Sequence, residues 1–458
     1  MTRFDLVLKR GHVIDPANGI DAILDVAIVK SRVAAVEPDI NPRQAKTLVD
    51  LSGKVVVPGI IDPHVHIRNV GHRNMAKVGV VTAVDVSAPM NDVLQSTKSF
   101  GTGMNIACIT SVHHHLKESR PVRAELDAML DDYLASGALG VKIIQEPLPH
   151  ETILNTIVAA NEKGAYVKLD CGVTEEGSNL LGLKWIVGAA GSDLRLDIAH
   201  INSYCRGQIK DPIEEALDAV RLLEGKENIQ SESYLGVING TSGRIISGVP
   251  LNGCTRDCLR IGGYPETEKG MKMALLEGYC KVPEQVGGET TLLEGAEALK
   301  AWLETDQRTV CFPVNSPSVA ILLATRKDSK KRFVVNAIST DGGSTPRNLI
   351  VNSGLALVRY GALTLNEFVV KTSFNPSRMY GMLEKGGLSV GMDADVTVLD
   401  LERGRAVMGI ALGTVIMVDG VVVGRGGTIL TTEKGVKTVK AFGLPYDVID
   451  LNQCGLYT

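Results

Sequence analysis

Residues 58–66 read Pro58-Gly59-Ile60-Ile61-Asp62-Pro63-His64-Val65-His66, which places a tight turn directly before an apolar strand that carries two histidines. Side chains two residues apart point to the same face of a strand, so His64 and His66 can bind one metal ion together. The alternative is a pair of histidines on a half-buried strand face without a ligand. The turn before the strand favours the metal site.

On the C-terminal side of this stretch, apolar strand-like runs alternate with amphipathic helical stretches such as residues 123–137, 151–164 and 211–225. The predicted strands lie within residues 55–62, 78–87, 105–113, 137–145, 165–172, 194–200, 228–235 and 332–341. Eight strands separated by helices predict an α/β fold, a (β/α)8 barrel of the TIM type.

Both ends of the chain differ from this pattern. Residues 4–57 and 388–432 alternate apolar and polar positions over short runs, with turn residues between them, and Asp419-Gly420 indicates a hairpin. We expect these runs to join into one small β-sandwich beside the barrel.

The domain boundaries follow from these patterns. We expect the N-terminal part of the sandwich at residues 1–57, the barrel at 58–385, and the rest of the sandwich with a tail at 386–458. Residues 240–331 are too many for one barrel connection, so we expect an insertion there, over the face that carries the active site.

Composition excludes several classes of protein. The net charge is −4, from 48 basic and 52 acidic residues, which argues against a nucleic-acid partner bound through a basic face. No apolar run approaches the roughly 18 residues that span a bilayer, and charges interrupt the apolar stretch at the N-terminus. The eight cysteines are scattered, so we expect reduced thiols and a cytoplasmic protein. Cys254 and Cys258 could share a helix face, which is weak evidence for a structural metal.

The stretch PGIIDPHVHI at 58–67 resembles the first-strand motif of the amidohydrolase superfamily, in the branch that includes dihydroorotases, hydantoinases and D-aminoacylases. DLSGKVVVPG at 50–59 and GGLSVGMDADVTVLD at 386–400 resemble the sandwich strands of that family. The resemblance covers nearly the whole chain except residues 240–331 and the tail after about residue 440. It implies a centre of one or two divalent metal ions, with zinc expected and manganese or iron as alternatives.

In this family the metals are held by two first-strand histidines, a carboxylated lysine, two later histidines and an aspartate. The resemblance assigns the lysine to Lys142 in Gly140-Val141-Lys142-Ile143-Ile144, a later histidine to His200, and the aspartate to Asp341. Carboxylation would remove the cation from a lysine that is costly to bury charged. The alternatives are a surface lysine, a buried structural histidine, and a turn residue in Thr340-Asp341-Gly342.

The fifth strand departs from the family pattern, because Val167-Lys168-Leu169-Asp170-Cys171 places Asp170 where the other histidine is expected. A carboxylate can bind zinc, manganese or iron, but it is a harder donor and adds a negative charge. Three arrangements are open: a binuclear site with Asp170 as a ligand, a mononuclear site, or Cys171 as the replacement. We expect Asp170 to be the ligand.

Further polar residues are candidates for substrate binding. His113, His114 and His115 follow the third strand, where we expect His113 to face the cavity; the alternative is a polar loop. Asn202 and Arg206 follow His200, and Arg206 could pair with a substrate carboxylate or be an ordinary surface arginine. Asp170, Glu232, Arg206 and Arg347 would together make the mouth of the site polar.

These observations predict a metal-dependent amidohydrolase that cleaves a C–N bond in a small cyclic amide, a ureide or an N-acyl amino acid. A metal-activated water would attack the carbonyl, with Asp341 as general acid and base. The alternatives are a non-catalytic hydantoinase-like scaffold and a deaminase of the same superfamily. We expect a small-molecule substrate, no nucleic-acid or membrane partner, and a homo-oligomer, as in relatives.

Overall fold

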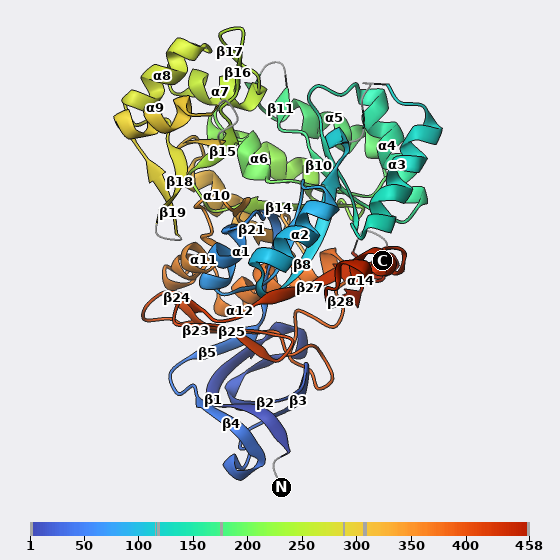
Figure 1. Ribbon diagram of the computed structural model, residues 1–458, viewed down its shortest axis with the longest axis vertical. Coiled ribbons are helices and arrows are strands. Elements are labelled where there is room, and N and C mark those ends of the chain that lie inside the picture. The colour runs from blue at the N-terminus through green and yellow to red at the C-terminus, as the bar shows by residue number, and fades with distance from the viewer. Residues whose placement is uncertain are drawn as a thin grey trace.

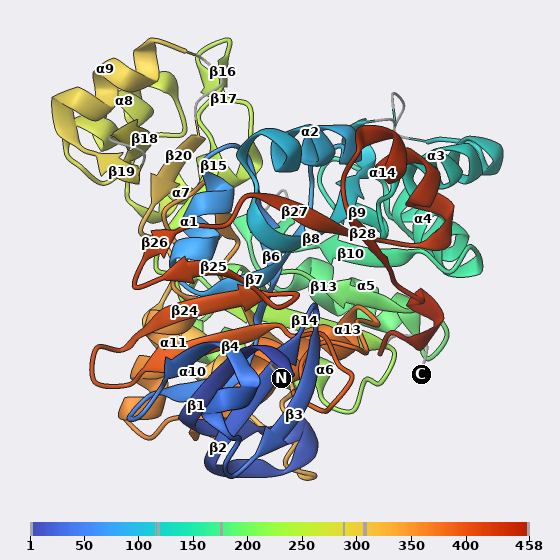
Figure 2. The same cartoon turned by 60° about the horizontal axis from the view of Figure 1, so that its bottom comes forward.

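The structure is a computed structural model that describes residues 3–114, 116, 120–174, 177–286, 289–305 and 309–455. The chain forms a central barrel, a sheet built from both termini, and a lobe that stands apart from the barrel (Figures 1 and 2). None of the helices in these ranges is both long and apolar enough to cross a membrane.

The barrel confirms the predicted (β/α)8 architecture. Each predicted run overlaps one barrel strand, and sequential strands pair in parallel. The strands are β6 (Ile60–His66), β7 (Val80–Asp85), β8 (Thr102–Ser111), β9 (Gly140–Ile144), β10 (Tyr166–Asp170), β13 (Leu196–Ile198), β14 (Ile229–Tyr234) and β21 (Ala337–Ser339). The short strand β22 (Gly342–Gly343) follows β21 and pairs with β6, which closes the barrel.

Helices cover the outside of the barrel. They are α1 (Gly71–Lys77), α2 (Met90–Phe100), α3 (Arg123–Ser136), α4 (His150–Glu162), α5 (Leu181–Ala190), α6 (Pro212–Leu223), α10 (Pro317–Thr325) and α11 (Ile350–Arg359). The start of α6 shows why the sequence folds locally: Asp211 accepts a hydrogen bond from the Ile213 N–H, and Pro212 occupies the first turn. In α3, Leu126, Leu130 and Leu134 recur every four residues and are buried in the main core.

The predicted strand 55–62 is two strands in two different sheets. β5 (Val55–Pro58) lies in the terminal sheet, and β6 begins after Gly59. The Gly59 N–H donates to the Asp395 carbonyl, and a Cβ at position 59 would lie 2.9 Å from the Asp395 Cβ. Only glycine fits this close approach, so the chain passes from one sheet to the other without a linker.

The terminal sheet contains nine strands, in the order β26, β25, β24, β23, β5, β1, β2 and β3, with β4 also paired to β1. Their bounds are β1 (Phe4–Asp15), β2 (Ile20–Val29), β3 (Arg32–Glu37), β4 (Ala45–Asp50), β23 (Val396–Asp400), β24 (Arg405–Ala411), β25 (Thr414–Val418) and β26 (Val421–Val422). Asp419 and Gly420, both with positive φ, form the predicted two-residue hairpin turn between β25 and β26. β5 lies between β1 and β23, so the two ends of the chain share one sheet.

We expected residues 388–432 to lie wholly in this sheet, and that is wrong for their last part. β27 (Gly426–Thr431) pairs in parallel with the barrel strand β8, and β28 (Tyr446–Val448) pairs with β27. Helix α14 (Val436–Phe442) connects them. Periodicity does not reveal this, because a strand has the same alternating pattern whichever sheet it joins.

Residues 239–314, which we call the insertion lobe, follow the carboxyl end of β14. The lobe has its own core around Trp302, Phe312 and Met271. Its elements are β15 (Asn239–Ser242), β16 (Ile245–Ile246), β17 (Val249–Pro250), α7 (Gly253–Ile261), α8 (Glu268–Leu276), β18 (Val282–Val286), β19 (Glu289–Leu293), α9 (Gly295–Leu303) and β20 (Thr309–Phe312). It ends earlier than the expected residue 331, because α10 packs on α6 and β14 as a barrel helix.

Candidate metal centre

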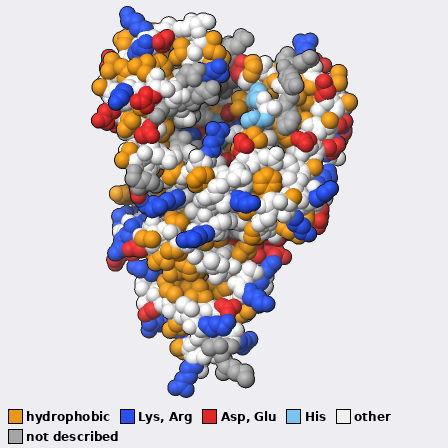
Figure 3. Space-filling model, in the orientation of Figure 1, with side chains coloured by type: hydrophobic (Ala, Val, Ile, Leu, Met, Phe, Trp, Pro, Cys, Tyr) orange, Lys and Arg blue, Asp and Glu red, His pale blue; other side chains and the backbone are white. Residues whose placement is uncertain are grey.

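The predicted metal-site residues come together at the carboxyl ends of the barrel strands, where barrel active sites lie. They are His64 and His66 on β6, Lys142 on β9, Asp170 at the end of β10, His200 after β13, and Asp341 after β21. All are buried except His66 and Asp170, which are half-buried. On the face shown in Figure 3, histidine side chains gather in a hollow between the insertion lobe and the helices opposite it.

Three of these side chains lie close enough together to hold one metal ion. The His66 Nε2 atom lies 3.0 Å from Asp341 Oδ1, and His64 Nε2 lies 3.5 Å from the same oxygen. One possible ligand atom from each of the three residues lies within 4.8 Å of the other two. Two ligands of a tetrahedral zinc ion lie roughly 3.3 Å apart, so the distances fit such an ion.

The other three side chains complete a second half of the site. His200 Nε2 lies 3.3 Å from Asp170 Oδ2, and Lys142 Nζ lies 4.0 Å from the same oxygen. Lys142 Nζ is also 3.5 Å from His64 Nε2, so the lysine lies between the two halves. The Cys171 thiol is buried and interacts with Tyr204, and burial raises its pKa, which disfavours the thiolate form that binds metals. Asp170, and not Cys171, therefore faces His200.

Each histidine is oriented through its other ring nitrogen. His64 Nδ1 lies 2.5 Å from Glu232 Oε1, His66 Nδ1 lies 2.9 Å from Ser87 Oγ, and His200 Nδ1 lies 2.7 Å from Ser203 Oγ. In all three rings the Nε2 atom is left for the centre. Partners of this kind are what metal-binding histidines have.

The charges of the site suit a cation. Burial and the nearby Lys142 side chain hold the pKa of His64 well below its usual value, so this imidazole is neutral. Burial opposes ionisation of Asp170, but the adjacent His200 outweighs it and lowers the pKa of Asp170 to about 2. For Asp341, burial is likewise outweighed, first by Arg347 and then by His66, and its pKa lies well below the usual range. The neutral His64 imidazole and the ionised carboxylates are in the forms that bind metals. Although burial opposes it, Asp170 raises the pKa of His200, so His200 would have to lose its proton to bind a metal.

Backbone strain is concentrated at two of these residues. His200 has φ 31° and Asp341 has φ 49°, in the left-handed region that non-glycine residues seldom adopt. The Asp341 N–H donates to the His64 carbonyl, and the His200 N–H donates to Glu232 Oε1. These bonds hold the strained turns, and such strain is typical of functional sites.

We expected Glu232 and Arg347 only to make the mouth of the site polar, but both contact proposed metal ligands. Glu232 contacts both His64 and His200, and it accepts a short hydrogen bond from Ser339. Arg347 Nη2 lies 2.6 Å from Asp341 Oδ2, and its Nε donates to the Asp341 carbonyl. The unbroken run of polar residues Gln230-Ser231-Glu232-Ser233-Tyr234 in a predicted barrel strand is a signal for Glu232. No pattern marks Arg347, which lies in the loop after Asp341.

The predicted substrate-binding residues differ in position. His113 is exposed on the turn Val112–His114 after β8; His114 Nε2 lies 2.8 Å from the Ser87 carbonyl, and His115 lies outside the described residues. Asn202 is buried and accepts the Tyr234 N–H. Arg206 is buried too and donates to Asn315 and Ser178. Neither Asn202 nor Arg206 therefore lies at an exposed mouth, because the insertion lobe and the end of β14 cover them.

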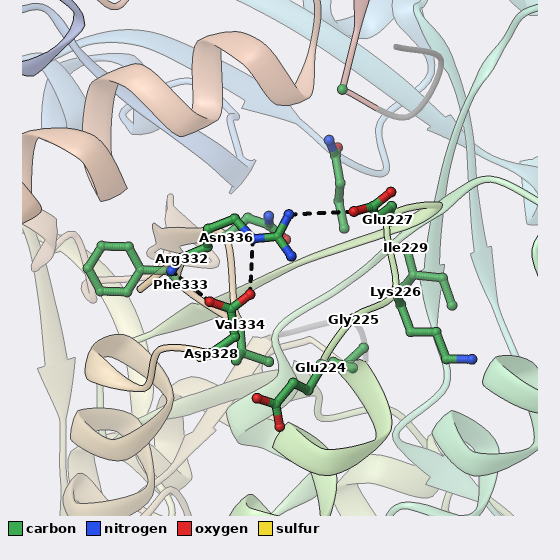
Figure 4. Close-up of a pocket in the computed structure, with 13 residues that line it drawn as sticks. Glu224, Gly225, Lys226, Glu227, Ile229, Asp328, Arg332, Phe333, Val334 and Asn336 are labelled. Atoms are coloured by element: carbon green, nitrogen blue, oxygen red, sulfur yellow. Dashed lines mark hydrogen bonds and ion pairs between the residues drawn. The ribbon is translucent and has the colours of Figure 1, made fainter. Parts of the chain in front are cut away.

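A pocket of about 290 Å³ lies elsewhere, at the amino-terminal ends of β14 and β21 (Figure 4). Arg332 in its wall pairs with Asp328 at 3.0 Å and with Glu227 at 3.6 Å. None of the predicted site residues lines it. It lies at the barrel end that does not carry the candidate centre.

Comparisons with known proteins agree with this geometry. The chain is 28% identical over 433 residues to a dihydroorotase of Syntrophotalea carbinolica, covering 87% of this chain and 89% of that protein. It is 26% identical over 416 residues to a dihydroorotase of Anaeromyxobacter dehalogenans, covering 86% and 88%. No protein-family model matches the chain.

Solved structures share the fold. A D-aminoacylase superposes with a TM-score of 0.68 at 19% identity, covering 93% of this chain and 99% of that one. An N-acyl-D-glutamate deacylase from Bordetella bronchiseptica, complexed with zinc and a phosphonate inhibitor, gives 0.65 at 15% identity over 93% and 99%. A dihydropyrimidinase from Brevibacillus agri gives 0.61 at 15% identity over 92% and 97%. The chain is thus similar in sequence to dihydroorotases, and it shares its fold with a D-aminoacylase, a dihydropyrimidinase and a D-hydantoinase.

Proposed function

We propose that this protein is a metal-dependent hydrolase that cleaves a C–N bond, other than a peptide bond, in a small cyclic amide, a ureide or an N-acyl amino acid. The observation that carries the proposal is the convergence of six side chains from five barrel strands, with His66 Nε2 and Asp341 Oδ1 only 3.0 Å apart. The dihydroorotases and D-aminoacylase to which the chain is similar support the type of bond.

The proposed ligands fall into two groups. His64, His66 and Asp341 would hold one ion, and Asp170 and His200 would hold a second, with a carboxylated Lys142 between them. Zinc is the first candidate; manganese and iron are alternatives because Asp170 adds a hard oxygen donor. A bound divalent ion supplies an acidified water and polarises the scissile carbonyl.

Lys142 is placed to become the carboxylated residue. Its neutral amine would attack the carbon of CO2 and lose one proton, which leaves a carbamate with two oxygen donors. The Nζ atom is buried, and its carboxylate neighbour Asp170 is 4.0 Å away, so the amine is not engaged in a close ion pair in the described part of the chain. Converting the cation to an anion removes an unfavourable charge from a site that binds cations.

Asp341 is the proposed proton carrier. Its Oδ1 faces His64 and His66, and its Oδ2 is held by Arg347 at 2.6 Å. Held as an ionised carboxylate in one orientation, Asp341 can accept a proton from the attacking water. It can then deliver that proton to the leaving nitrogen. His113, exposed at the end of β8, is proposed to contact the substrate; Asn202 and Arg206 would act from beneath the surface.

All eight cysteines lie in the described part of the chain, and all are free thiols, which supports the proposed cytoplasmic location. The proposed partner is a small molecule. The homo-oligomer stays a prediction from the family resemblance.

The test combines metal analysis with a substrate panel. Protein purified without chelators is analysed by plasma mass spectrometry and assayed with dihydroorotate, hydantoins, dihydropyrimidines and N-acyl-D-amino acids. We expect one or two equivalents of metal and turnover of at least one class, abolished by chelation and restored by the metal. Less than one equivalent of metal and no turnover would favour the non-catalytic scaffold instead.

A further inference from the structure

A second polar cluster lies where the insertion lobe meets the barrel. Cys254 Sγ accepts a hydrogen bond from Asn239 Nδ2 at 3.2 Å and from Arg206 Nη1 at 3.9 Å. The same Asn239 amide reaches Cys258 Sγ at 3.7 Å, and the Cys258 thiol donates to the Cys254 sulfur. Three donors, the Asn239 amide, the Arg206 guanidinium and the Cys258 thiol, thus lie around two sulfur atoms that the proposed hydrolysis does not use.

Arg206 is a buried cation without a carboxylate partner. Arg206 is only 6% exposed. No carboxylate in the described ranges lies within ion-pair distance of its guanidinium. Its Nη2 atom has no hydrogen-bond partner there either. An unpaired buried charge is strongly unfavourable. A thiolate at Cys254 would supply the missing negative charge.

The other charged groups near the cluster are already paired. Asp257, on the same helix, accepts the Ser178 N–H through one oxygen and pairs with Arg260 at 3.3 Å through the other. Tyr234 bonds to Asn315, which in turn accepts from Arg206 Nε. The charge of Arg206 is therefore directed mainly at Cys254, which also lies in the first turn of the nine-residue helix α7.

Cys254 differs from the other seven cysteines of the chain. It is half-buried, and the others are buried. The hydrogen bond from Cys258 and the charge of Arg206 outweigh burial and lower the pKa of Cys254 to about 6. Burial raises the pKa of Cys108, Cys171, Cys205, Cys258, Cys280 and Cys311. Low thiol pKa together with exposure is what makes a cysteine reactive.

We propose that Cys254 is a peroxide-sensitive thiol and that Cys258 is its resolving partner. The Cys254 thiolate attacks one oxygen of hydrogen peroxide; the S–O bond forms, the O–O bond breaks, and hydroxide leaves. Sulfur is oxidised to a sulfenic acid and the peroxide is reduced. The Cys258 thiol then attacks the Cys254 sulfur, so that the S–S bond forms, the S–O bond breaks and water leaves. The first turn of α7 must open slightly, because Cβ atoms four residues apart on a helix lie about 5–6 Å apart.

The test uses the full-length, reduced protein and does not depend on hydrolase activity. The rate of iodoacetamide alkylation at each cysteine is measured against pH by peptide mass spectrometry. We expect Cys254 to react first, with a half-maximal rate near pH 6. Stoichiometric hydrogen peroxide should give a Cys254–Cys258 disulfide in wild type. In Cys258→Ser it should give a Cys254 sulfenic acid that dimedone traps.

Variants of Arg206 and Asn239 test whether these side chains, and not solvent exposure alone, make Cys254 reactive. Arg206→Gln should slow the alkylation of Cys254 at pH 6 by roughly tenfold, and Arg206→Lys should restore much of the rate. Should Arg206→Gln not fold, Asn239→Ala removes the other donor and should slow the reaction in the same direction. Cys311→Ala, in the same lobe, is the control and should leave labelling unchanged. A Cys254 that alkylates with a half-maximal rate near pH 8.5, like an ordinary thiol, would overturn the proposal.

Discussion

Lys142 on β9 and Lys168 on β10 are register partners on neighbouring parallel strands, yet their amino groups have different environments. Lys168 Nζ lies 2.6 Å from Asp197 and 3.4 Å from Glu232, and although burial opposes its charge, these partners raise the pKa of Lys168. In the described part of the chain, Lys142 Nζ has one carboxylate within ion-pair distance, Asp170 at 4.0 Å, and it also lies 3.5 Å from His64 Nε2. Lys168 is therefore a structural ammonium, and Lys142 is the lysine that we propose is carboxylated.

Replacing Lys142 with alanine should lower metal content and reduce kcat by more than about a hundredfold, because the oxygen donors between the two halves are lost. Acetate or formate in excess should restore part of both, since the carboxylate and not the amine is required. Metal content and kcat are measured with and without the added acid. Full activity in the unsupplemented variant would contradict the assignment.

Lys168→Met is the matched control for that experiment. Removing the ammonium leaves Asp197 buried without its partner, which costs about 3–5 kcal/mol of unfolding free energy. We expect a lower thermal midpoint by calorimetry and no rescue by small carboxylates. Rescue comparable to that of Lys142→Ala would mean that the two lysines are not distinguished as proposed.

Asp341→Asn should keep a metal ion at His64 and His66 but lower kcat by roughly 10² to 10⁴, because an amide cannot accept the proton. Metal content and kcat are determined on the same preparation. Metal loss together with activity loss would show a ligand role only. Rates like those of wild type at neutral pH would exclude Asp341 as the proton carrier.

Glu232→Gln tests the support of the histidines. Glu232 Oε1 contacts both His64 Nδ1 and the His200 N–H, so the change should weaken metal binding by about 10- to 100-fold, measured by competition with a chelator. Ser87→Ala removes the neutral partner of His66 and should have a smaller effect. Equal effects of the two changes would argue against a special role for Glu232.

Substitutions of Asp170 test whether this residue is a metal ligand in place of the histidine expected from the family pattern. Asp170→Ala should lose one equivalent of metal, while Cys171→Ser should lose none. Asp170→His should keep the metal and shift the acidic limb of the pH–rate profile to lower pH, because a neutral ligand leaves more positive charge on the metal pair and a more acidic water. Full metal stoichiometry and an unchanged profile in Asp170→Ala would make Asp170 a bystander.

The barrel and the meeting of the proposed ligands could be predicted because both depend on local patterns. Apolar runs mark the strands, and the carboxyl ends of parallel strands meet at one end of a barrel, so His64, Lys142 and His200 had to approach one another. Asp341 was assigned through the resemblance to the family, because a Thr-Asp-Gly turn alone is not specific.

Contacts between distant segments could not be predicted in the same way. The pairing of β27 with β8, the bond from Glu232 to His64 and the ion pair of Arg347 with Asp341 depend on three-dimensional packing. The break at Gly59 was missed because Val55–Asp62 is apolar on both sides of it. The burial of Arg206 was missed because the insertion lobe that covers it has no recognisable pattern.

The position of β5 between β1 and β23 has a consequence for biosynthesis. The Ile60 N–H donates to Thr397 Oγ1, a residue 337 positions later, and β5 pairs with β23 next to that bond. At 5–20 residues per second, a ribosome needs roughly 20–70 s to make the intervening chain. For that time the N-terminal strands have an unpaired, apolar edge of the kind that recruits other chains. Nascent chains that stop before residue 396 should therefore aggregate or occupy chaperones.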